Sequence, residues 1–593
     1  MKNLNYLNKY FFKYKIQFSL GFLCVLASNF FGLFPAIYIG KGFDFIEKSL
    51  EGANDSLSPK IIENIVGQNL LLGLFFSIIF FVLMKGVFMF LMRQTVIVVS
   101  RKIEYDLKNE IYQKYQSLPM SFFQKNNVGD IISRVSEDVS KVRMYLGPAI
   151  LYSMNLIILL ILILSRMFIV SPKLTFWALL PLPILSVSIY YISKHINIKS
   201  EYAQIKLAQL TNVSQQIISG VRTVKSSVNE ISTLKYFNSF SEKYMKSQLD
   251  LVRVNALFFP FMLFIVGSSI LLTILAGNYY NVNIGIIAEF IIYVNMLTWP
   301  VTSIGWVTSI IQTASASQKR INEFLYEKSE IDSSSNKKVK ESIRYGKIKF
   351  KNVFCTYSNR DLIALKNINF NIKGGGTLGI IGSIGSGKST IIKLICHFLS
   401  TSKGCIYIDD IPINDLKISS IRSSISYVPQ DDFLFSDTIK NNLLFGNIDA
   451  TNDDIKNALT DVFMYNEVLK FKEGLNTYIG ERGVTLSGGQ KQRLSIARAI
   501  LKKSKILLLD DCFSSVDVDT EKNILATIFR KYKKDLTVII VSNRIHSIMH
   551  CDNIIVLEKG SIIEEGGHTH LLSLKGFYHK LNSIQMENFH KKA

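Results

Sequence analysis

A glycine-rich octapeptide in the second half of the chain has the residue types and spacing of a phosphate-binding loop. It fits the pattern G-x-x-x-x-G-K-[ST] at every fixed position and consists of Gly382, Ser383, Ile384, Gly385, Ser386, Gly387, Lys388 and Ser389. An apolar run over 377–381 predicts the preceding strand, and 390–396, beginning at Thr390, predicts the following helix. The motif requires this strand–loop–helix context, so we predict a nucleoside triphosphate site.

The chemistry of such a site explains the residue types in the octapeptide. Glycines let the backbone curl so that its N–H groups face phosphate oxygens, and the helix N-terminus adds partial positive charge. Lys388 would neutralise the β- and γ-phosphates, and the Ser389 hydroxyl would ligate Mg²⁺. The alternative is a glycine-rich turn with a chance lysine, which the flanking strand and helix disfavour.

Two further motifs in this half of the chain suit nucleotide chemistry. Apolar 506–509 predicts a buried strand ending in Asp510 and Asp511, an arrangement in which Asp510 would hold Mg²⁺ through water. Upstream, a predicted helix over 491–501 is preceded by Leu486, Ser487, Gly488, Gly489 and Gln490. The small residues of this second motif let a phosphate approach the backbone at the helix N-terminus.

Composition places part of the chain in a membrane. With 593 residues the chain is too long for one domain, and 48% hydrophobic residues with a mean hydropathy of +0.24 exclude a wholly soluble protein. The net charge of +22 could indicate nucleic acid, but basic cytoplasmic loops of a membrane protein give the same sum. The six cysteines show no metal-ligand spacing, which predicts reduced, structural thiols.

Apolar runs of about 20 residues predict an all-α membrane domain with six spans over residues 1–325. The runs are 18–39, 69–91, 149–170, 174–193, 256–277 and 288–308. The long connections 93–146 and 194–254 are helical in pattern and rich in Lys and Arg. Because basic residues are retained on the inner side, we expect these connections and both chain ends in the cytoplasm. Residues 1–15 predict a short helix in the inner interface.

Several polar residues fall inside the predicted spans, where they are costly. Lys85 could line a cavity, snorkel or pair with a neighbouring helix. Arg166 and Glu289 lie near the outer ends of their spans, and we expect them to snorkel to the interface. Four others could line a polar-aromatic pathway or serve interhelical packing: Asn155, Asn295, Trp299 and Trp306.

A polar stretch separates the two halves of the chain. Residues 326–345 lack apolar periodicity and predict a linker. Over 346–593, short β-rich runs alternate with helical segments, which predicts an α/β nucleotide-binding domain of the P-loop NTPase class.

With these motifs in view, the chain resembles the ABC transporter superfamily, specifically half-size exporters whose membrane domain precedes an ABC-type nucleotide-binding domain. The match spans nearly the whole chain, and the signature Leu486–Gln490 is its most diagnostic part. The resemblance implies ATP and Mg²⁺ as cofactors. It assigns Tyr357 to adenine stacking, and Gln430 to the loop that senses Mg²⁺ and contacts the membrane domain.

Other stretches are similar to secondary motifs of these exporters. Residues 478–483 look like the X-loop, and 514–517 look like the D-loop. Residues 129–135 and 219–225 look like parts of the two intracellular loops whose short coupling helices dock onto nucleotide domains.

Two positions depart from the family pattern, and both concern hydrolysis. The family usually has Glu after the Mg²⁺-binding aspartate, and Asp511 stands there in this chain. Its shorter side chain draws the carboxylate back by about 1 Å, which can cost on the order of 10²-fold in rate. Asn543 replaces the usual switch histidine and cannot carry an imidazolium charge. His546 could substitute only if the loop were rebuilt, and a surface histidine is the favoured interpretation.

The intact signature beside a weakened hydrolytic site predicts an asymmetric dimer. In this superfamily each ATP is bound between one chain's phosphate loop and the other chain's signature. We therefore favour a heterodimer with a second half-transporter in the cell membrane, with a slowly hydrolysing homodimer as the alternative. A non-transporting, nucleotide-gated regulator is a further hypothesis, whereas the six spans oppose a nucleic-acid partner. Apart from contact with membrane lipid, the sequence leaves the substrate open.

Overall fold

The computed structural model describes residues 2–52, 60–327, 343–357, 362–480, 483, 485–532 and 535–590. The chain forms two compact units. One comprises Met1–Ser117 and Asn127–Glu327, and the other comprises Leu118–Asn126 and Lys328–Ala593. The linker predicted over 326–345 falls mostly on 328–342, which lie outside the described residues, so its ends stay a prediction.

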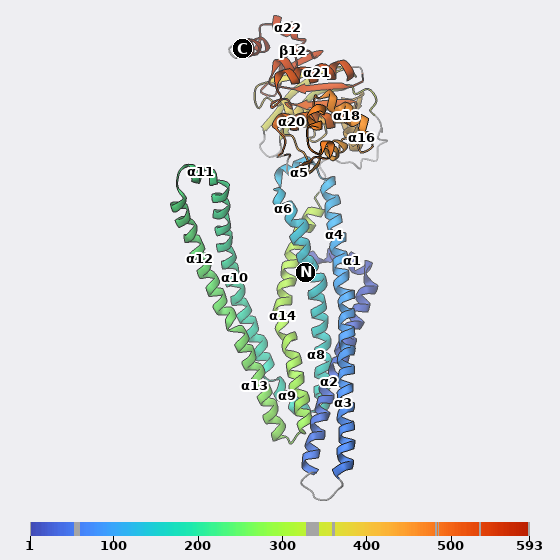
Figure 1. Cartoon of the computed structure of the whole chain (residues 1–593), viewed down its shortest axis with the longest axis vertical. Coiled ribbons are helices and arrows are strands. Elements are labelled where there is room, and N and C mark those ends of the chain that lie inside the picture. Colours follow the sequence, from blue (N-terminus) through green and yellow to red (C-terminus); the bar gives the residue numbers. More distant parts are fainter. Residues whose placement is uncertain are drawn as a thin grey trace. The chain divides into compact units, whose positions relative to one another are not determined.

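The first unit is helical, as predicted (Figure 1). Its helices are η1 (Lys2–Leu7), α1 (Asn8–Lys13), α2 (Lys15–Gly52), α3 (Lys60–Met92), η2 (Arg93–Ile97), α4 (Val98–Ser117), α6 (Val128–Ser133), η3 (Arg134–Asp138), α7 (Val139–Met144), η4 (Tyr145–Ala149), α8 (Ile150–Val170), α9 (Pro172–Leu179), α10 (Pro181–Ser219), α11 (Val221–Ser226), α12 (Glu230–Ala256), α13 (Phe258–Tyr279) and α14 (Ile284–Leu325). Figure 1 shows α10 and α12 side by side as a hairpin that α11 closes.

Five helical segments are long and apolar enough to cross a membrane, counted over the described residues. They are Lys15–Glu47, Leu71–Ser117, Val128–Val170, Glu230–Tyr279 and Ile284–Leu325. Four of them contain one predicted span each, and Leu71–Ser117 contains the span 69–91 except for its first two residues. The fourth predicted span, 174–193, is not among them. Its chain is divided between α9 and α10 at Pro181, because proline cannot donate the backbone hydrogen bond that would continue the helix.

The N-terminal residues are helical as predicted, but they dock on protein. Leu4 and Leu7 are buried, and Lys9 donates to Glu110 of α4 at 2.7 Å. The Tyr10 hydroxyl donates to the same carboxylate at 2.7 Å. Burial raises the pKa of Tyr10, and the hydrogen bond to the anionic carboxylate raises it further, so the phenol remains a donor. This segment is therefore bonded to α4 through its Lys9 and Tyr10 side chains, while η1 contacts α14.

The second unit is an α/β domain with two main sheets. Its strands are β1 (Ile348–Tyr357), β2 (Leu362–Ile372), β3 (Thr377–Gly382), β4 (Lys403–Ile408), β5 (Ile411–Pro412), β6 (Ile425–Val428), β7 (Asp437–Thr438), β8 (Tyr478–Ile479), β9 (Ile506–Asp510), β10 (Thr537–Val541), β11 (Asn553–Glu558) and β12 (Ser561–Gly566). One sheet has the order β12-β11-β3-β10-β9-β6, and a four-stranded antiparallel sheet has the order β2-β1-β4-β5.

The six-stranded sheet is mixed, because β12 runs antiparallel to β11 while β3, β6, β9, β10 and β11 run parallel. Its parallel strands β3, β9 and β10 are buried along their whole length, as expected for strands covered on both faces. Since the carboxyl ends of parallel strands meet at one edge, the loops after β3, β9 and β10 gather there.

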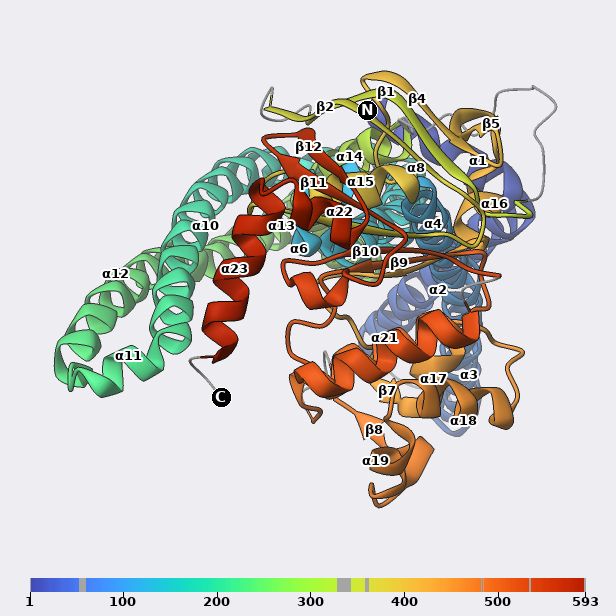
Figure 2. The ribbon, with the colours of Figure 1, turned by 90° about the horizontal axis from the view of Figure 1, so that it is seen from above.

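The second unit also contains helices, several of which complete two hydrophobic cores with the sheets. They are α5 (Met120–Lys125), α15 (Lys388–Ile395), η5 (Ile413–Asp415), α16 (Ile418–Ser423), α17 (Ile439–Leu444), α18 (Asn452–Asp461), α19 (Tyr465–Leu469), η6 (Gly474–Asn476), α20 (Gly488–Leu501), α21 (Val518–Tyr532), η8 (Ile545–Ser547), α22 (His568–Ser573) and α23 (Phe577–His590). One core joins α17, α18 and α20 to the parallel sheet, and the other joins the antiparallel sheet to α15. Figure 2 shows these two layers on opposite sides of β9 and β10.

Candidate nucleotide site

The octapeptide forms a tight loop between β3 and α15. A Cβ at Gly382 would lie 2.1 Å from the backbone oxygen of Leu557, so only glycine fits against β11 there. Gly387 has φ of 102° directly before α15, a left-handed conformation that favours glycine. Ile384 at the tip is 96% exposed. The predicted strand, loop and helix are thus confirmed, although the helix begins at Lys388, two residues before the predicted start.

The polar groups of this loop point inward. The Lys388 ammonium group donates to the backbone oxygens of Gly382 and Ser383, at 2.8 and 3.0 Å. Burial lowers the pKa of Lys388, and the nearby carboxylates of Asp511 and Asp510 oppose that shift. The Ser386 hydroxyl is buried and makes no hydrogen bond to the described part of the chain. A buried, unmatched hydroxyl beside a cation and backbone N–H groups is consistent with an anionic ligand.

Ser389 and Asp510 meet as the sequence predicted. The Ser389 hydroxyl donates to the Asp510 carboxylate at 3.0 Å, and the Tyr427 hydroxyl donates to its other oxygen at 3.4 Å. Burial raises the pKa of Asp510, while the hydrogen bond from Ser389 opposes the shift. Hydroxyl and carboxylate oxygens at the phosphate loop are ligands that Mg²⁺ prefers, so these two residues fit that ion.

Tyr357 and Gln430, to which the resemblance assigns nucleotide and Mg²⁺ contacts, differ in their position relative to the phosphate loop. The Tyr357 hydroxyl lies 3.2 Å from that of Thr390, which places the ring beside the first turn of α15. Gln430 is exposed two residues after β6, and over the described residues it forms no hydrogen bond with Ser389 or Asp510. Its role in Mg²⁺ binding stays a prediction.

Asp511 and Asn543 are in direct contact. They follow the neighbouring parallel strands β9 and β10, whose register pairs Asp510 with Val541. The Asn543 amide donates to the Asp511 carboxylate at 3.1 Å. Asp511 has φ of 48°, a left-handed conformation that aspartate tolerates better than most residues. The two unusual residues therefore form one hydrogen-bonded pair.

His546 belongs to a separate cluster around Glu521. Glu521 of α21 is fully buried, and its carboxylate accepts from Arg544 at 2.9 Å and lies 3.1 Å from the His546 ring. The Ser547 hydroxyl donates to the same carboxylate. The imidazole is thus held toward α21, and the prediction of a surface histidine is wrong in that the ring is mostly buried and bonded.

The signature motif caps α20. Ser487 is the N-cap, its hydroxyl accepting from the Gln490 backbone, while the Gln490 side chain accepts from the Ser487 backbone at 3.0 Å. This reciprocal capping box satisfies backbone donors that a helix N-terminus leaves unpaired. Gln490 also donates to Glu467 of α19, which pairs with Arg493 at 2.7 Å. The motif is therefore held in a fixed conformation by its own helix and by α19.

The D-loop packs against the signature glycines within the same chain. A Cβ at Gly489 would lie 2.9 Å from the Ser515 backbone oxygen, so glycine permits the contact. Gln492 donates to the Ser514 hydroxyl at 2.9 Å and accepts from the Ser515 backbone at 2.8 Å.

Sequence reasoning missed three residues that hold these loops. Gln492 and Glu467 fix the signature, as described above. Gln585 of α23 donates to the Asn543 backbone at 2.8 Å and accepts from the Ile545 backbone at 2.9 Å. The position of Gln492 two residues after Gln490 was a usable signal, whereas nothing in the sequence links Gln585 to a loop forty residues earlier. The predicted X-loop includes 481 and 482, which lie outside the described residues.

The polar residues of the membrane unit mostly pair with one another. Arg166 of α8 lies 3.1 Å from the buried Glu289 of α14, which also accepts from Tyr293 at 2.7 Å. The expectation that both snorkel separately is therefore wrong, because opposite charges in an apolar region are stabilised by pairing. Asn155 accepts from Asn29 of α2 at 2.8 Å, which supports the interhelical alternative.

Three other membrane residues share one face of α14. Trp299 is 67% exposed in this chain, Trp306 is 47% exposed, and Asn295 is exposed with its amide bonded to its own helix. Trp306 packs edge-on against Tyr152 of α8. Whether this face lines a pathway stays a prediction.

Comparison with known families finds matches in both units. Residues 18–301 match the ABC transporter transmembrane region, and residues 365–514 match the ABC transporter family model.

Curated relatives match over most of their length. The uncharacterized ABC transporter ATP-binding protein YknU of Bacillus subtilis is 34% identical over 89% of this chain and 91% of its own. The multidrug resistance-like ATP-binding protein MdlA of Buchnera aphidicola is 34% identical over 98% of both chains. An ATP-dependent lipid A-core flippase of Pseudomonas fluorescens is 30% identical over 82% of this chain and 81% of its own.

A solved structure shares the fold. A bacterial Atm1-family ABC exporter with ATP bound superposes with a TM-score of 0.75 at 22% identity, covering 96% of this chain and 98% of the other.

Proposed function

The chain belongs to the ABC transporter family, and on that premise we propose that it is one half of a dimeric, ATP-driven exporter in the cell membrane. The observation that carries this proposal is the union, in one chain, of a membrane unit with a phosphate loop and a capped signature motif. Two of its relatives are named as a multidrug resistance-like protein and a lipid A-core flippase, which favours an apolar or amphipathic substrate.

We propose six spans with both chain ends in the cytoplasm. The missing fourth span would consist of α9 and the first part of α10, with Pro181 making a bend within the membrane. The basic connections 93–146 and 194–254 support a cytoplasmic position for the long helical extensions.

The phosphate loop of this chain would hold ATP. Lys388 and the backbone N–H groups before α15 would face the phosphates, and Tyr357 would meet the adenine ring. Ser389, Asp510 and Gln430 would hold Mg²⁺, which supplies positive charge against the phosphate oxygens when bound. Residues 487–490 would face the ATP held by the partner.

We propose that hydrolysis is slow at this chain's own loop. Asp511 would have to orient water with a carboxylate that is one methylene short and already accepts from Asn543. The signature motif of this chain is intact and is held by α19, so it suits a second site that hydrolyses the ATP bound by the partner. This asymmetry favours a heterodimer over a homodimer.

Transport by reconstituted assemblies tests the proposal. The chain is co-expressed with a candidate partner half-transporter, reconstituted into vesicles, and supplied with ATP outside and a fluorescent apolar dye as probe. ATP-dependent dye accumulation that is lost when the partner's phosphate-loop lysine is replaced supports export. ATP-gated leakage that runs only down the dye gradient would instead establish the regulator and overturn export.

The same preparation distinguishes the two kinds of dimer. Rapid hydrolysis by the chain alone, abolished by Asp511→Asn, would contradict the slow-site proposal. Slow hydrolysis alone that rises at least tenfold with the partner supports a heterodimer.

A further inference from the structure

A cavity of about 170 Å³ opens on the second unit, at the edge of the six-stranded sheet opposite the phosphate loop. Its floor is apolar and consists of Ala499, Ile500, Leu507, Ile528 and Leu536. Apart from Ile500, each of these side chains is buried. An apolar cavity of about 150 Å³ accommodates a molecule as large as benzene. The space therefore fits the apolar body of a small ligand.

Four elements that carry loops of the candidate nucleotide site meet at this cavity by their other ends. α20 begins at the signature and contributes Ala499 from its last turn. β9 contributes Leu507 near its start and ends at Asp510, and α21 follows the D-loop and contributes Ile528. Leu536 directly precedes β10, which leads to a further loop of the site. Because coupling between distant sites is carried by rigid elements, a ligand that displaces these ends would also displace the loops.

Several polar groups at the mouth of the cavity are engaged with other parts of the unit. Lys503 pairs with Asp454 of α18 at 2.8 Å, and the Tyr532 hydroxyl donates to Asp461 at 2.5 Å. The Ser504 hydroxyl donates to a backbone oxygen at 2.9 Å. These three groups therefore already have partners within the protein.

Lys505 and Asp535 also line the mouth, and they carry opposite charges. Both residues are exposed. Over the described residues, neither side chain forms an ion pair or a hydrogen bond with the other or with any further residue. An ammonium group and a carboxylate thus flank the entrance to an apolar space.

We propose that this cavity binds an α-amino acid with a bulky apolar side chain, and that its occupancy changes the rate of ATP hydrolysis. The apolar side chain would fill the floor of the cavity. The ligand carboxylate would accept from Lys505, and the ligand ammonium group would donate to Asp535, so both charges would form charge-assisted hydrogen bonds. The binding site is independent of the proposed export, whereas the effect on hydrolysis rests on it.

The test measures binding to the full chain in nanodiscs by calorimetry, with L-leucine and L-phenylalanine as probes. Each probe is compared with analogues that lack one charged group: 4-methylpentanoate and 3-methylbutylamine for leucine, and 3-phenylpropanoate and 2-phenylethylamine for phenylalanine. Glycine lacks the apolar body. The kcat for ATP of the assembly with a candidate partner is measured with and without each probe.

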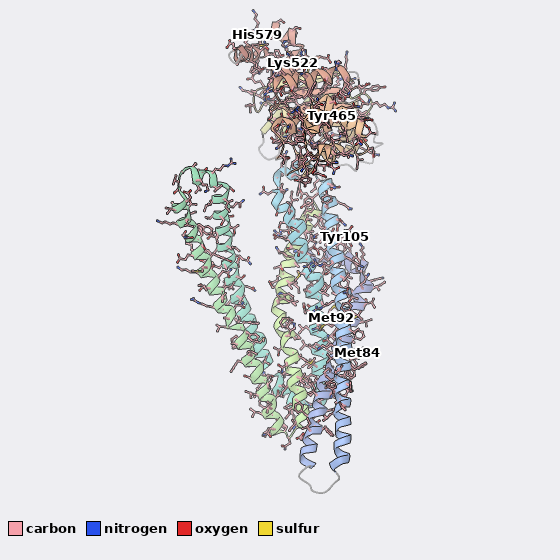
Figure 3. The ribbon with its side chains drawn as sticks, viewed as in Figure 1. Met84, Met92, Tyr105, Tyr465, Lys522 and His579 are labelled. Carbon is pink, nitrogen blue, oxygen red and sulfur yellow. The ribbon has the colours of Figure 1, made fainter. Side chains whose placement is uncertain are left out.

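Two variants each remove one charge from the mouth of the cavity. They are Lys505→Gln and Asp535→Asn, and both are at exposed positions, so we expect the fold to be retained. Lys522→Gln is the matched control, because Lys522 is an exposed lysine near the start of α21 that does not line the cavity (Figure 3).

We expect leucine or phenylalanine to bind at least tenfold more tightly than its two analogues and glycine, and to change kcat of the assembly at least threefold. Lys505→Gln and Asp535→Asn should each weaken this binding at least tenfold, and Lys522→Gln should leave it unchanged. The inference is overturned if neither amino acid binds, if an analogue binds as tightly as its parent, or if both charge variants bind like the control. Binding with an unchanged kcat would overturn the regulatory role.

Failure of the proposed function gives a different result. An assembly that binds the amino acid but neither hydrolyses ATP nor transports the dye would contradict the exporter itself. An active exporter that binds neither amino acid would contradict only the assignment of this cavity.

Discussion

At the scale of single residues, the hydrolytic side of the site is defined by one hydrogen bond. Asn543 donates to Asp511 at 3.1 Å, and the two side chains occupy positions where the family usually has His and Glu. An amide can hold a carboxylate in place, but it cannot exchange a proton near neutral pH. Ser389 and Asp510, by contrast, have the contacts expected of a Mg²⁺ site. On the roles proposed for these four residues, substitutions of Asp511 or Asn543 would change ATP turnover without changing ATP binding.

Asp511→Glu is expected to increase hydrolysis at this loop. The added methylene advances the carboxylate by about 1 Å, so the rate should rise on the order of tenfold or more. The gain is measured as kcat of the chain alone, with ATP affinity unchanged. Asp511→Asn is the matched control and should remove the residual rate. An unchanged kcat in the Glu variant would show that the short side chain is not limiting.

Asp432 predicts a pH-dependent contribution to stability. Burial raises its pKa from 3.8 to about 6, although the charge of Arg498 opposes the shift. Because the folded pKa exceeds the unfolded value of about 3.9, this group's stabilising contribution is present below about pH 4 and lost as pH rises towards 6.

Asp432→Asn removes this titration. The thermal midpoint of the variant minus that of the unmodified chain should become more positive between pH 4 and 6 and remain constant above that range. Scanning calorimetry of the full chain measures the difference. Asp449→Asn, at an exposed loop position, is the control. A difference that is constant with pH would contradict the shifted pKa.

At the scale of elements, the loops of the site are held by helices distant in sequence. The parallel strands β9 and β10 bring Asp511 and Asn543 together through their register. α23 then fixes the loop after β10 through the two bonds from Gln585. α20 carries both the capped signature and Gln492, which binds the D-loop. Each loop is therefore coupled to a rigid element rather than left free.

Gln585→Ala is expected to lower kcat by roughly tenfold with little change in KM for ATP, because misplacing Asn543 affects turnover more than binding. Gln585→Glu keeps the acceptor for the Ile545 N–H and should restore part of the rate. Steady-state kinetics of the assembly measure both. Glu587→Ala on an exposed position of α23 is the control. A change in KM alone would assign Gln585 to nucleotide binding instead.

At the scale of the whole molecule, we propose that the chain supplies two different half-sites. One is its phosphate loop with the Asp511–Asn543 pair, and the other is its signature, which α19 holds in place. If sites form between chains, the half-sites serve different ATP molecules. The ATPase activity of the assembly should then depend unequally on the two half-sites of this chain.

Ser487→Asp is expected to lower ATPase activity of the assembly far more than Lys388→Ala does. Aspartate caps a helix as well as serine, so α20 remains intact while its charge repels the partner's ATP. Turnover of the heterodimer should fall at least tenfold in the first variant and less than threefold in the second. Size-exclusion chromatography confirms assembly. Equal losses would indicate two equivalent sites.

The sequence by itself determined the strand, loop and helix around the phosphate loop, the helix after the signature, the strand that ends at Asp510 and most of the spans. Those features are local: glycine spacing, a lysine before a helix and runs of apolar residues each act within a few turns of chain. It also showed that Asp511 and Asn543 differ from the Glu and His usual in the family. Residue identity alone limits which protons a side chain can donate or accept.

Only the tertiary structure decided which of these residues meet. The contact between Asp511 and Asn543 depends on strand order, and Arg166 pairs with Glu289 because α8 packs on α14. The hydrogen bond from Gln585 to the Asn543 backbone and the contact between Lys85 and Gly32 likewise join residues distant in the chain. Such contacts depend on how surfaces pack, and local sequence patterns carry no information about the partner that a side chain will find.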